Sequence, residues 1–148
     1  MPDADSIRKI ARQRAVELNL PYTGALLPQE AHALMGEGAK LVDVRTKAEL
    51  EWVGRVPGSL AIEWNTWPDG KPNPDFMPQL QAQVGREKAV MFLCRSGARS
   101  HKAAVAATQA GYVESYNILE GFEGDKDAES HRNTSGGWRV AGLPWIQG

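Results

Sequence analysis

From residue 40 onward, short apolar runs alternate with stretches of helical periodicity, and no other feature of the sequence constrains the fold as strongly. Such alternation is typical of a parallel sheet whose crossover helices cover its faces. We therefore expect an α/β domain with a parallel central sheet flanked by helices. The expected strands are 40–44, 58–62, 88–93 and 115–119, and the expected helices between them are 46–53, 75–84 and 98–110.

Two more helices are expected before the first of these strands. Apolar residues recur at helical spacing over residues 5–19, and residues 28–36 begin with a proline and end with a glycine. The polar segment between them, which contains proline and glycine, is expected to be a connection. We predict that residues 1–27 form an N-terminal helical extension that packs on the domain, and that residues 28–148 form the domain itself.

Length and charge exclude several classes of protein. The chain has 148 residues, enough for one compact domain. Its 17 basic and 18 acidic residues leave a net charge of −1, which argues against nonspecific binding to nucleic acid or to an anionic membrane. No apolar run is long enough to cross a membrane, and the charged N-terminal segment does not resemble a secretory signal. We therefore expect a cytoplasmic location, with no nucleic-acid or membrane partner.

The sequence contains a single cysteine, Cys94. One thiol cannot form an internal disulfide, a CxxC redox pair or a metal site built from several thiolates. His32 and His131 lie in different segments without a ligand pattern. We therefore expect no metal site and no cofactor.

Cys94 follows the apolar run at 90–93 and opens the segment Cys-Arg-Ser-Gly-Ala-Arg-Ser, which leads into an alanine-rich helix. This arrangement places a thiol at the carboxyl end of a central strand, where open α/β sheets bind their ligands. Backbone amides at a helix N-terminus attract anions, and together with Arg95 and Arg99 they would stabilise a thiolate. A cysteine at a strand end can instead be a small core residue, but the two arginines and the glycine that follow it favour a reactive thiol.

The segment 94–99 resembles the six-residue active-site loop of the rhodaneses, which are sulfurtransferases that carry sulfur as a cysteine persulfide. Three further segments are similar to other parts of that family: 41–62, 117–124 and 137–145. The resemblance extends over roughly residues 38–145 and implies a three-layer domain, with a parallel sheet of about five strands and helices on both faces. Two positions depart from the family pattern, since Arg55 stands where histidine is usual and Ser59 where alanine is common.

The resemblance also implies a thiosulfate sulfurtransferase that works by double displacement. Cys94 would take the outer sulfur of thiosulfate, release sulfite, and pass the sulfur to cyanide or to a thiol acceptor. By the same resemblance, family members that use thiosulfate tend to carry a basic residue beside the cysteine, so Arg95 favours thiosulfate as the donor. Because thiosulfate is a small dianion, Arg95 and Arg99 would bind it. The substrate-binding residues that the loop implies are Arg95, Ser96, Gly97, Ala98 and Arg99.

Two other functions remain open. The domain could be a sulfur carrier that delivers persulfide to a partner protein through its N-terminal helix. Cysteine-dependent phosphatases and arsenate reductases also hold a thiol in an anion-binding loop, but their arginine occupies the position where this chain has Ser100. Because Arg99 lies one residue earlier, we expect the loop to be too tight for phosphate or arsenate.

Asp43 and Arg45 end the first core strand and are expected to face the same mouth of the sheet as the loop. Asp43 could bond the loop backbone and support its shape. We expect Arg45 and Glu49, which are four residues apart, to form an ordinary helical ion pair. His101 follows the loop and is expected to be a surface or structural residue and not a catalytic base.

Tryptophans are expected to anchor the segments that have no regular structure. Trp64, Trp67 and Trp138 are each expected in the core, with at least one of them lining the entrance to the site. The tail after residue 121 also holds Trp145, so we expect it to pack back on the domain.

Overall fold

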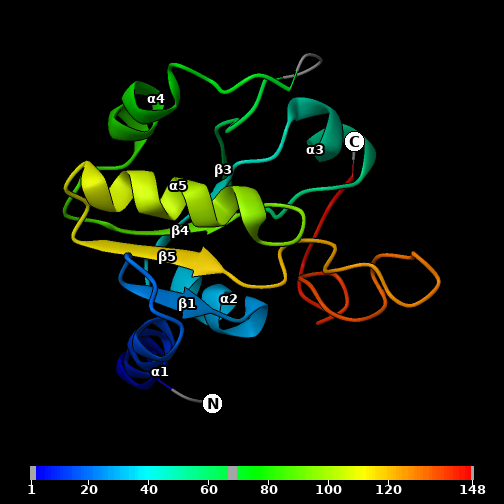
Figure 1. The fold of residues 1–148 in the computed structure, drawn as a ribbon, viewed down its shortest axis with the longest axis horizontal. Helices are drawn as coiled ribbons and strands as arrows, with labels where there is room; N and C mark the ends of the chain where they lie inside the picture. Colours follow the sequence, from blue (N-terminus) through cyan, green and yellow to red (C-terminus); the bar gives the residue numbers. More distant parts are fainter. Residues whose placement is uncertain (1–2, 67–69, 148) are drawn as a thin grey trace.

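The structure is a computed structural model that describes residues 3–66 and 70–147. Within these residues five parallel strands form one sheet in the spatial order β1-β5-β4-β2-β3 (Figure 1). The strands are β1 (Gly24–Leu26), β2 (Lys40–Asp43), β3 (Leu60–Ala61), β4 (Ala89–Leu93) and β5 (Glu114–Ile118). The helices are α1 (Ala4–Glu17), α2 (Pro28–Gly36), α3 (Lys47–Trp52), α4 (Phe76–Gln83) and α5 (Ala98–Gln109). The expected α/β class with a five-stranded parallel sheet is confirmed.

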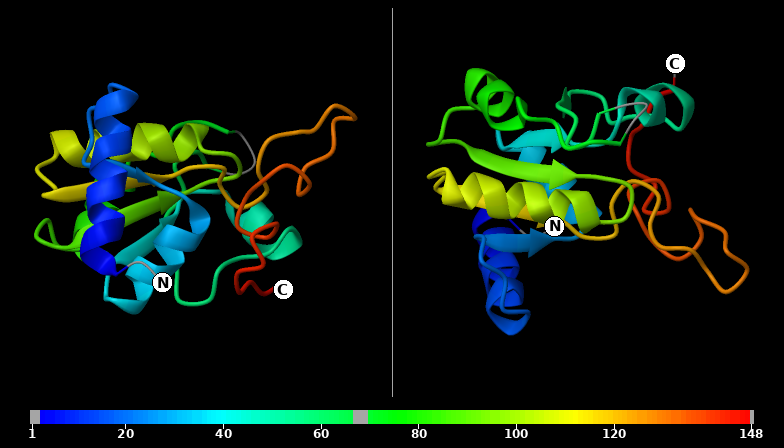
Figure 2. Two further views of the ribbon diagram at one scale, coloured as in Figure 1. Left: turned by 90° about the horizontal axis from the view of Figure 1, so that it is seen from below. Right: turned by 45° about the horizontal axis from the view of Figure 1, so that its top comes forward.

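Successive side chains of the central strand β4 point to opposite faces of the sheet. Met91 and Leu93 belong to a core cluster that they share with α1 and α2. Val90 and Phe92 belong to the cluster shared with α4 and α5. The ribbon in Figure 2 accordingly shows helices on both sides of the sheet. Cys94 continues the second set, so its thiol lies on the side of the sheet that α5 covers.

The prediction of a simple connection between the first two helices is wrong, because this segment contains the edge strand β1, which pairs with β5. Gly24 explains how the strand fits beneath α1. A Cβ atom at this position would lie 2.8 Å from the backbone carbon of Ala11, so only glycine permits the close approach. Three residues are too few for a recognisable strand pattern in the sequence.

The C-terminal tail packs on the carboxyl end of the sheet, as expected. Trp138 is fully buried and donates its indole N–H to the carbonyl of Pro144 over 2.8 Å. Further along, Ile146 pairs with Arg55 in an antiparallel bridge, with N–O distances of 2.7 and 2.8 Å. Figure 1 shows this segment, in orange and red, beside α3 at the end of the sheet where β4 and β5 finish. The tail thus becomes part of the surroundings of Cys94.

The remaining tryptophan predictions have mixed outcomes. Trp138 lies in the core, as expected. Trp64 is only partly buried and packs edge-on against Phe76 at the margin of the core, with ring centroids 4.9 Å apart. Trp67 lies outside the described residues. In the described part of the chain, no helix combines the length and the apolar character needed to span a membrane.

Candidate active site

The thiol of Cys94 lies at the end of β4 and is almost completely buried. Its Sγ accepts a hydrogen bond from the backbone N–H of Gly97 over 3.0 Å and lies 3.3 Å from the Oγ of Ser100. Gly97 is the N-cap of α5 and has a φ of +116°, which favours glycine. The loop therefore turns a backbone amide towards the sulfur, and the N-terminus of α5 adds its partial positive charge.

A second turn, residues 120–124, braces the outer side of this loop. The N–H groups of Phe122 and Glu123 bond the carbonyls of Cys94 and Arg95 over 2.8 and 3.0 Å. Gly121 lies between the two turns with a φ of +65°, and a Cβ atom there would come within 2.5 Å of the Arg95 carbonyl. The carbonyls of Cys94 and Arg95 are thus satisfied by the second turn, which fixes the outer side of the loop while the N–H of Gly97 bonds the sulfur.

Arg99 forms a two-pronged ion pair with Glu49. The two Nη–Oε distances are 2.7 and 2.9 Å, and both side chains are about three-quarters buried. Burial by itself would raise the pKa of Glu49, but the hydrogen bonds and charge of Arg99, with the hydroxyl and N–H of Thr46, lower it to about 2. The same pairing with Glu49 raises the pKa of Arg99. The predicted pair between Arg45 and Glu49 is therefore wrong.

Arg45 instead turns back to Asp43, and both side chains are fully buried. Nε and Nη2 of the guanidinium bond the two carboxylate oxygens over 2.9 and 2.7 Å, and Nη2 also donates to the carbonyl of Gly54. Arg45 precedes the helix that begins after the N-cap Thr46, so the helical spacing rule does not apply to it. Its guanidinium lies 4.2 Å from the centre of the Phe122 ring. The pair thus contacts the turn that braces the loop.

A pocket of about 440 Å³ lies beside the loop, between α3 and the segment that follows β3. Arg95 and Arg99 reach it from the loop side, and Trp52 reaches it from the end of α3. Among the described residues the exposed Arg95 guanidinium has no hydrogen bond or ion pair, whereas Arg99 is neutralised by Glu49. Trp52 is 66% exposed. Its place in the pocket was not predicted, although an exposed tryptophan at the end of a short helix could have indicated a binding surface. The other lining residues are Thr46, Ala48, Glu49, Val53, Asn65, Thr66 and Gly70.

Of the other loop residues, Ser96 lies in the turn between Cys94 and α5 and is partly exposed, and Ala98 is the exposed first residue of α5. Ser100, the first buried residue after the loop, donates its hydroxyl hydrogen to Oδ1 of Asn117 over 2.6 Å. Neither Ser100 nor Asn117 was identified as a site residue from the sequence. Asn117 lies between Tyr116 and Ile118 in β5. A polar residue between two apolar residues of a central strand could have indicated that Asn117 has a buried polar partner.

Within the described residues His101 makes no hydrogen bond to the thiol, as expected for a structural residue. Its Nδ1 lies 2.8 Å from the hydroxyl of Tyr22, and the two rings meet edge to face. In the described residues no three His, Cys, Asp or Glu side chains are grouped in a way that could hold a metal ion.

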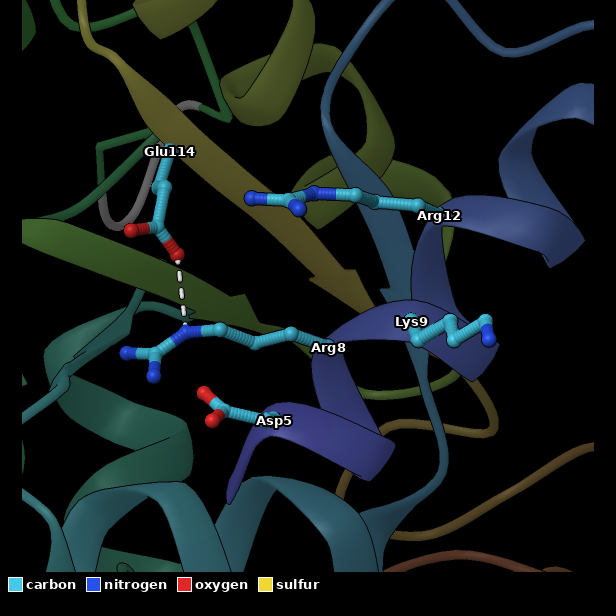
Figure 3. A pocket seen from close by; sticks show the side chains of 5 residues that line it. All are labelled: Asp5, Arg8, Lys9, Arg12 and Glu114. Carbon is cyan, nitrogen blue, oxygen red and sulfur yellow. Dashed lines mark hydrogen bonds and ion pairs between the residues drawn. The ribbon is translucent and has the colours of Figure 1, made fainter.

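Figure 3 shows a different pocket, between α1 and the start of β5. Arg8 donates to Glu114 over 3.0 Å, while Asp5, Lys9 and Arg12 line the rest of it. Glu114 pairs with Ala89 at the amino ends of β5 and β4, whereas Cys94 follows the carboxyl end of β4. This pocket therefore lies at the amino end of the parallel strands, whereas the thiol lies at their carboxyl end.

Comparison with known proteins identifies several relatives. Residues 27–128 match the family model described as "Rhodanese-like domain". The "Uncharacterized protein RP600 homolog" of Rickettsia rickettsii is 36% identical over 118 residues, which cover 76% of this chain and 86% of the relative. A "Sulfurtransferase" of Allochromatium vinosum is 31% identical over 86 residues, which cover 58% of this chain and 70% of the relative. The crystal structure of Rv0390 from M. tuberculosis is 44% identical, has a TM-score of 0.78, and is matched over 86% of this chain and 99% of that one.

Proposed function

Because the chain belongs to the rhodanese-like domain family, we propose that it is a thiosulfate sulfurtransferase in which Cys94 carries the transferred sulfur as a persulfide. Membership of the family and the relative named as a sulfurtransferase support a role in sulfur transfer. The observation that carries the proposal for this chain is the position of the only cysteine. Its Sγ accepts a hydrogen bond from the N–H of Gly97, inside a loop whose outer carbonyls are bonded by the turn at 120–124.

The first half-reaction would load the sulfur. The Cys94 thiolate attacks the outer sulfur of thiosulfate and forms a new S–S bond, while the S–S bond of the donor breaks and sulfite leaves with its electron pair. The N–H of Gly97 and the N-terminus of α5 favour negative charge on the sulfur during this step. Arg95 is the cation best placed for the donor, since the Arg99 charge is balanced by Glu49.

The second half-reaction would discharge it. Cyanide or a thiolate attacks the outer sulfur of the persulfide, takes that sulfur, and leaves the Cys94 thiolate ready for another turn. With one cysteine in the sequence, no second thiol of the same chain can resolve the persulfide as a disulfide. The acceptor must therefore be another molecule. No cofactor is needed for either step.

The residues around the loop have distinct proposed roles. Arg95 would bind the donor, while Ser96, Gly97 and Ala98 would supply the backbone that surrounds the sulfur. Arg99 would hold the loop to α3 through Glu49. Asp43 and Arg45 would support the loop from beneath, through Phe122 and not by the direct bond from Asp43 considered earlier.

The two alternatives are less well supported. The pocket of Figure 3, which α1 lines, lies at the amino end of the strands. A partner docked only there would be at the opposite end of the sheet from Cys94, which weighs against delivery of sulfur through the N-terminal helix. Cysteine-dependent phosphatases and arsenate reductases hold the oxyanion with an arginine at the position where this chain has Ser100, which is buried and bonded to Asn117. Arg99, one residue earlier, is paired with Glu49, which weighs against these activities.

The proposal is tested by steady-state kinetics with thiosulfate and cyanide, following thiocyanate. The unmodified chain should turn over, and the Cys94→Ser variant should form no thiocyanate above the uncatalysed rate. Substitution of Ser115, a buried serine on β5 that makes no hydrogen bond through its hydroxyl within the described residues, provides the control. Ser115→Ala should retain full activity. Activity in Cys94→Ser close to that of the unmodified chain would contradict the proposal.

A further inference from the structure

The Cys94 thiol is the first member of a buried chain of hydrogen-bonding side chains. The Sγ of Cys94 is 3.3 Å from the Oγ of Ser100, and that hydroxyl donates to Oδ1 of Asn117 over 2.6 Å. Ser100 is fully buried and Asn117 nearly so. Water therefore does not replace these contacts, and their direction matters for the sulfur.

The orientation of the Asn117 amide follows from its other partners. Its Nδ2 lies 3.3 Å from the carbonyl of Gly97, which can only accept. The Tyr22 hydroxyl also lies near the Asn117 side chain and is 2.8 Å from Nδ1 of His101. With the nitrogen committed to Gly97, the amide oxygen must be the atom that faces Ser100.

The count of hydrogens then decides what Ser100 can do for the sulfur. A serine hydroxyl has one hydrogen, and while Asn117 accepts it the oxygen can only accept from Cys94. A thiol satisfies that arrangement, because its S–H can donate to Ser100. A thiolate has no hydrogen to give, so the hydroxyl must turn from Asn117 to the sulfur before it can stabilise the negative charge.

We propose that Asn117 is a positioning residue that holds the Ser100 hydroxyl in the orientation suited to the thiol and thereby restrains the reactivity of Cys94 at rest. When Cys94 ionises, the Ser100 hydroxyl turns to the sulfur and loses its hydrogen bond to Asn117. The loss of that bond is the free-energy cost of ionisation that Asn117 imposes. This inference rests on the proposed function, in which the Cys94 thiolate is the nucleophile. It goes beyond that function in assigning a restraining role to a residue that touches neither donor nor acceptor.

Other charged and titratable groups surround the thiol and stay unchanged in the test. Arg95 and Arg99 belong to the loop and the start of α5, and Asp43 and Arg45 are paired at the end of β2 and just beyond it. The Tyr22–His101 pair lies near Asn117.

The test measures the rate at which iodoacetamide alkylates Cys94, read by intact mass, over pH 5 to 9. Asn117→Val has a side chain of similar size that suits a strand, and it frees the hydroxyl. We expect alkylation at neutral pH to be about fivefold faster than in the unmodified chain, the worth of one net hydrogen bond, with the pH profile displaced to lower pH. Alkylation needs no sulfur donor, so a failure of sulfur transfer would leave this measurement intact.

A double-mutant cycle separates the positioning role from a general loosening of the site. In a Ser100→Ala background, Asn117→Val should leave the alkylation rate unchanged, because there is no hydroxyl to release. Ser115→Ala serves again as the control on β5 and should behave as the unmodified chain. Where Asn117→Val does not fold, as judged by thermal unfolding, Asn117→Ala replaces it with the same expectation. An equal acceleration with and without Ser100, or no acceleration in the folded variant, overturns the proposal.

Discussion

The ion pair between Glu49 and Arg99 joins α3 to the active loop, and Glu49→Gln isolates the contribution of its charge. Glu49 is also the third residue of α3, where its Oε1 accepts the N–H of Thr46 in a capping box. Glutamine can make the same capping bond. The variant therefore keeps the helix start and removes only the negative charge that Arg99 needs.

The size of the effect follows from the pKa of Glu49. A fall from 4.5 to about 2 corresponds to an upper limit of about 3 kcal/mol, at about 1.36 kcal/mol per pH unit. Both side chains keep 20–24% exposure, and water and salt screen the pair. We therefore expect Glu49→Gln to lower the free energy of unfolding by about 1–2 kcal/mol at pH 7.

The pH dependence gives the prediction its sign. The folded-state pKa lies below the unfolded value, so the stabilisation is fully present above pH 4.5 and is lost as the pH falls towards 2. The difference in unfolding free energy between the unmodified chain and Glu49→Gln should therefore be constant from pH 7 to pH 5 and shrink steadily below that. Urea unfolding, followed by tryptophan fluorescence at several pH values, measures this difference.

Glu30→Gln is a matched control, because Glu30 is also the third residue of its helix, α2, and pairs with Arg14 in the same two-pronged way. It should be destabilised too but keep its sulfur-transfer rate, whereas Glu49→Gln should alter that rate by releasing Arg99 beside the loop. A stability difference for Glu49→Gln that is absent at pH 7, or equally large at pH 3 and pH 7, would refute the reasoning.

Three further predictions concern the loop and its pocket. Gly121→Ala should cost about 2–4 kcal/mol of unfolding free energy and abolish sulfur transfer, since its Cβ would meet the loop backbone; Gly142→Ala, with a similar φ of +76° but open space around it, should cost only about 1 kcal/mol and retain activity. Arg95→Gln should raise the KM for thiosulfate about tenfold with little change in kcat, as expected for a lost charge-assisted hydrogen bond; an unchanged KM in initial-rate kinetics would show that Arg95 does not bind the donor. Trp52→Ala should lower the ratio of discharge rates with thiophenol and with cyanide by about threefold to tenfold, because an aromatic acceptor would lose a wall of the pocket; an unchanged ratio would place aromatic acceptors elsewhere.

The sequence predicted all five helices and four of the five strands that the structure describes, because their patterns are local. The expected helix at 28–36 coincides with α2, and the helix after the loop begins at Ala98 as expected. The edge strand β1 was missed because three residues carry no periodicity and its glycine resembles a turn signal.

The partners of the site residues were harder to predict, because they depend on tertiary contacts. Arg45 and Glu49 have helical spacing, but the helix begins between them, so Arg45 turns to the sheet and Glu49 is left to Arg99. Ser100 and Asn117 are 17 residues apart and meet only because β5 lies beside β4 and beneath α5. No spacing rule in the sequence reports such a contact.

The account depends on sulfur being carried by Cys94. Intact mass spectrometry of the chain after incubation with thiosulfate tests this most directly. We predict a mass increase of one sulfur atom, located on the peptide that contains Cys94, removed by cyanide and absent in Cys94→Ser. An unmodified mass after thiosulfate treatment, or the same adduct in Cys94→Ser, would contradict the account.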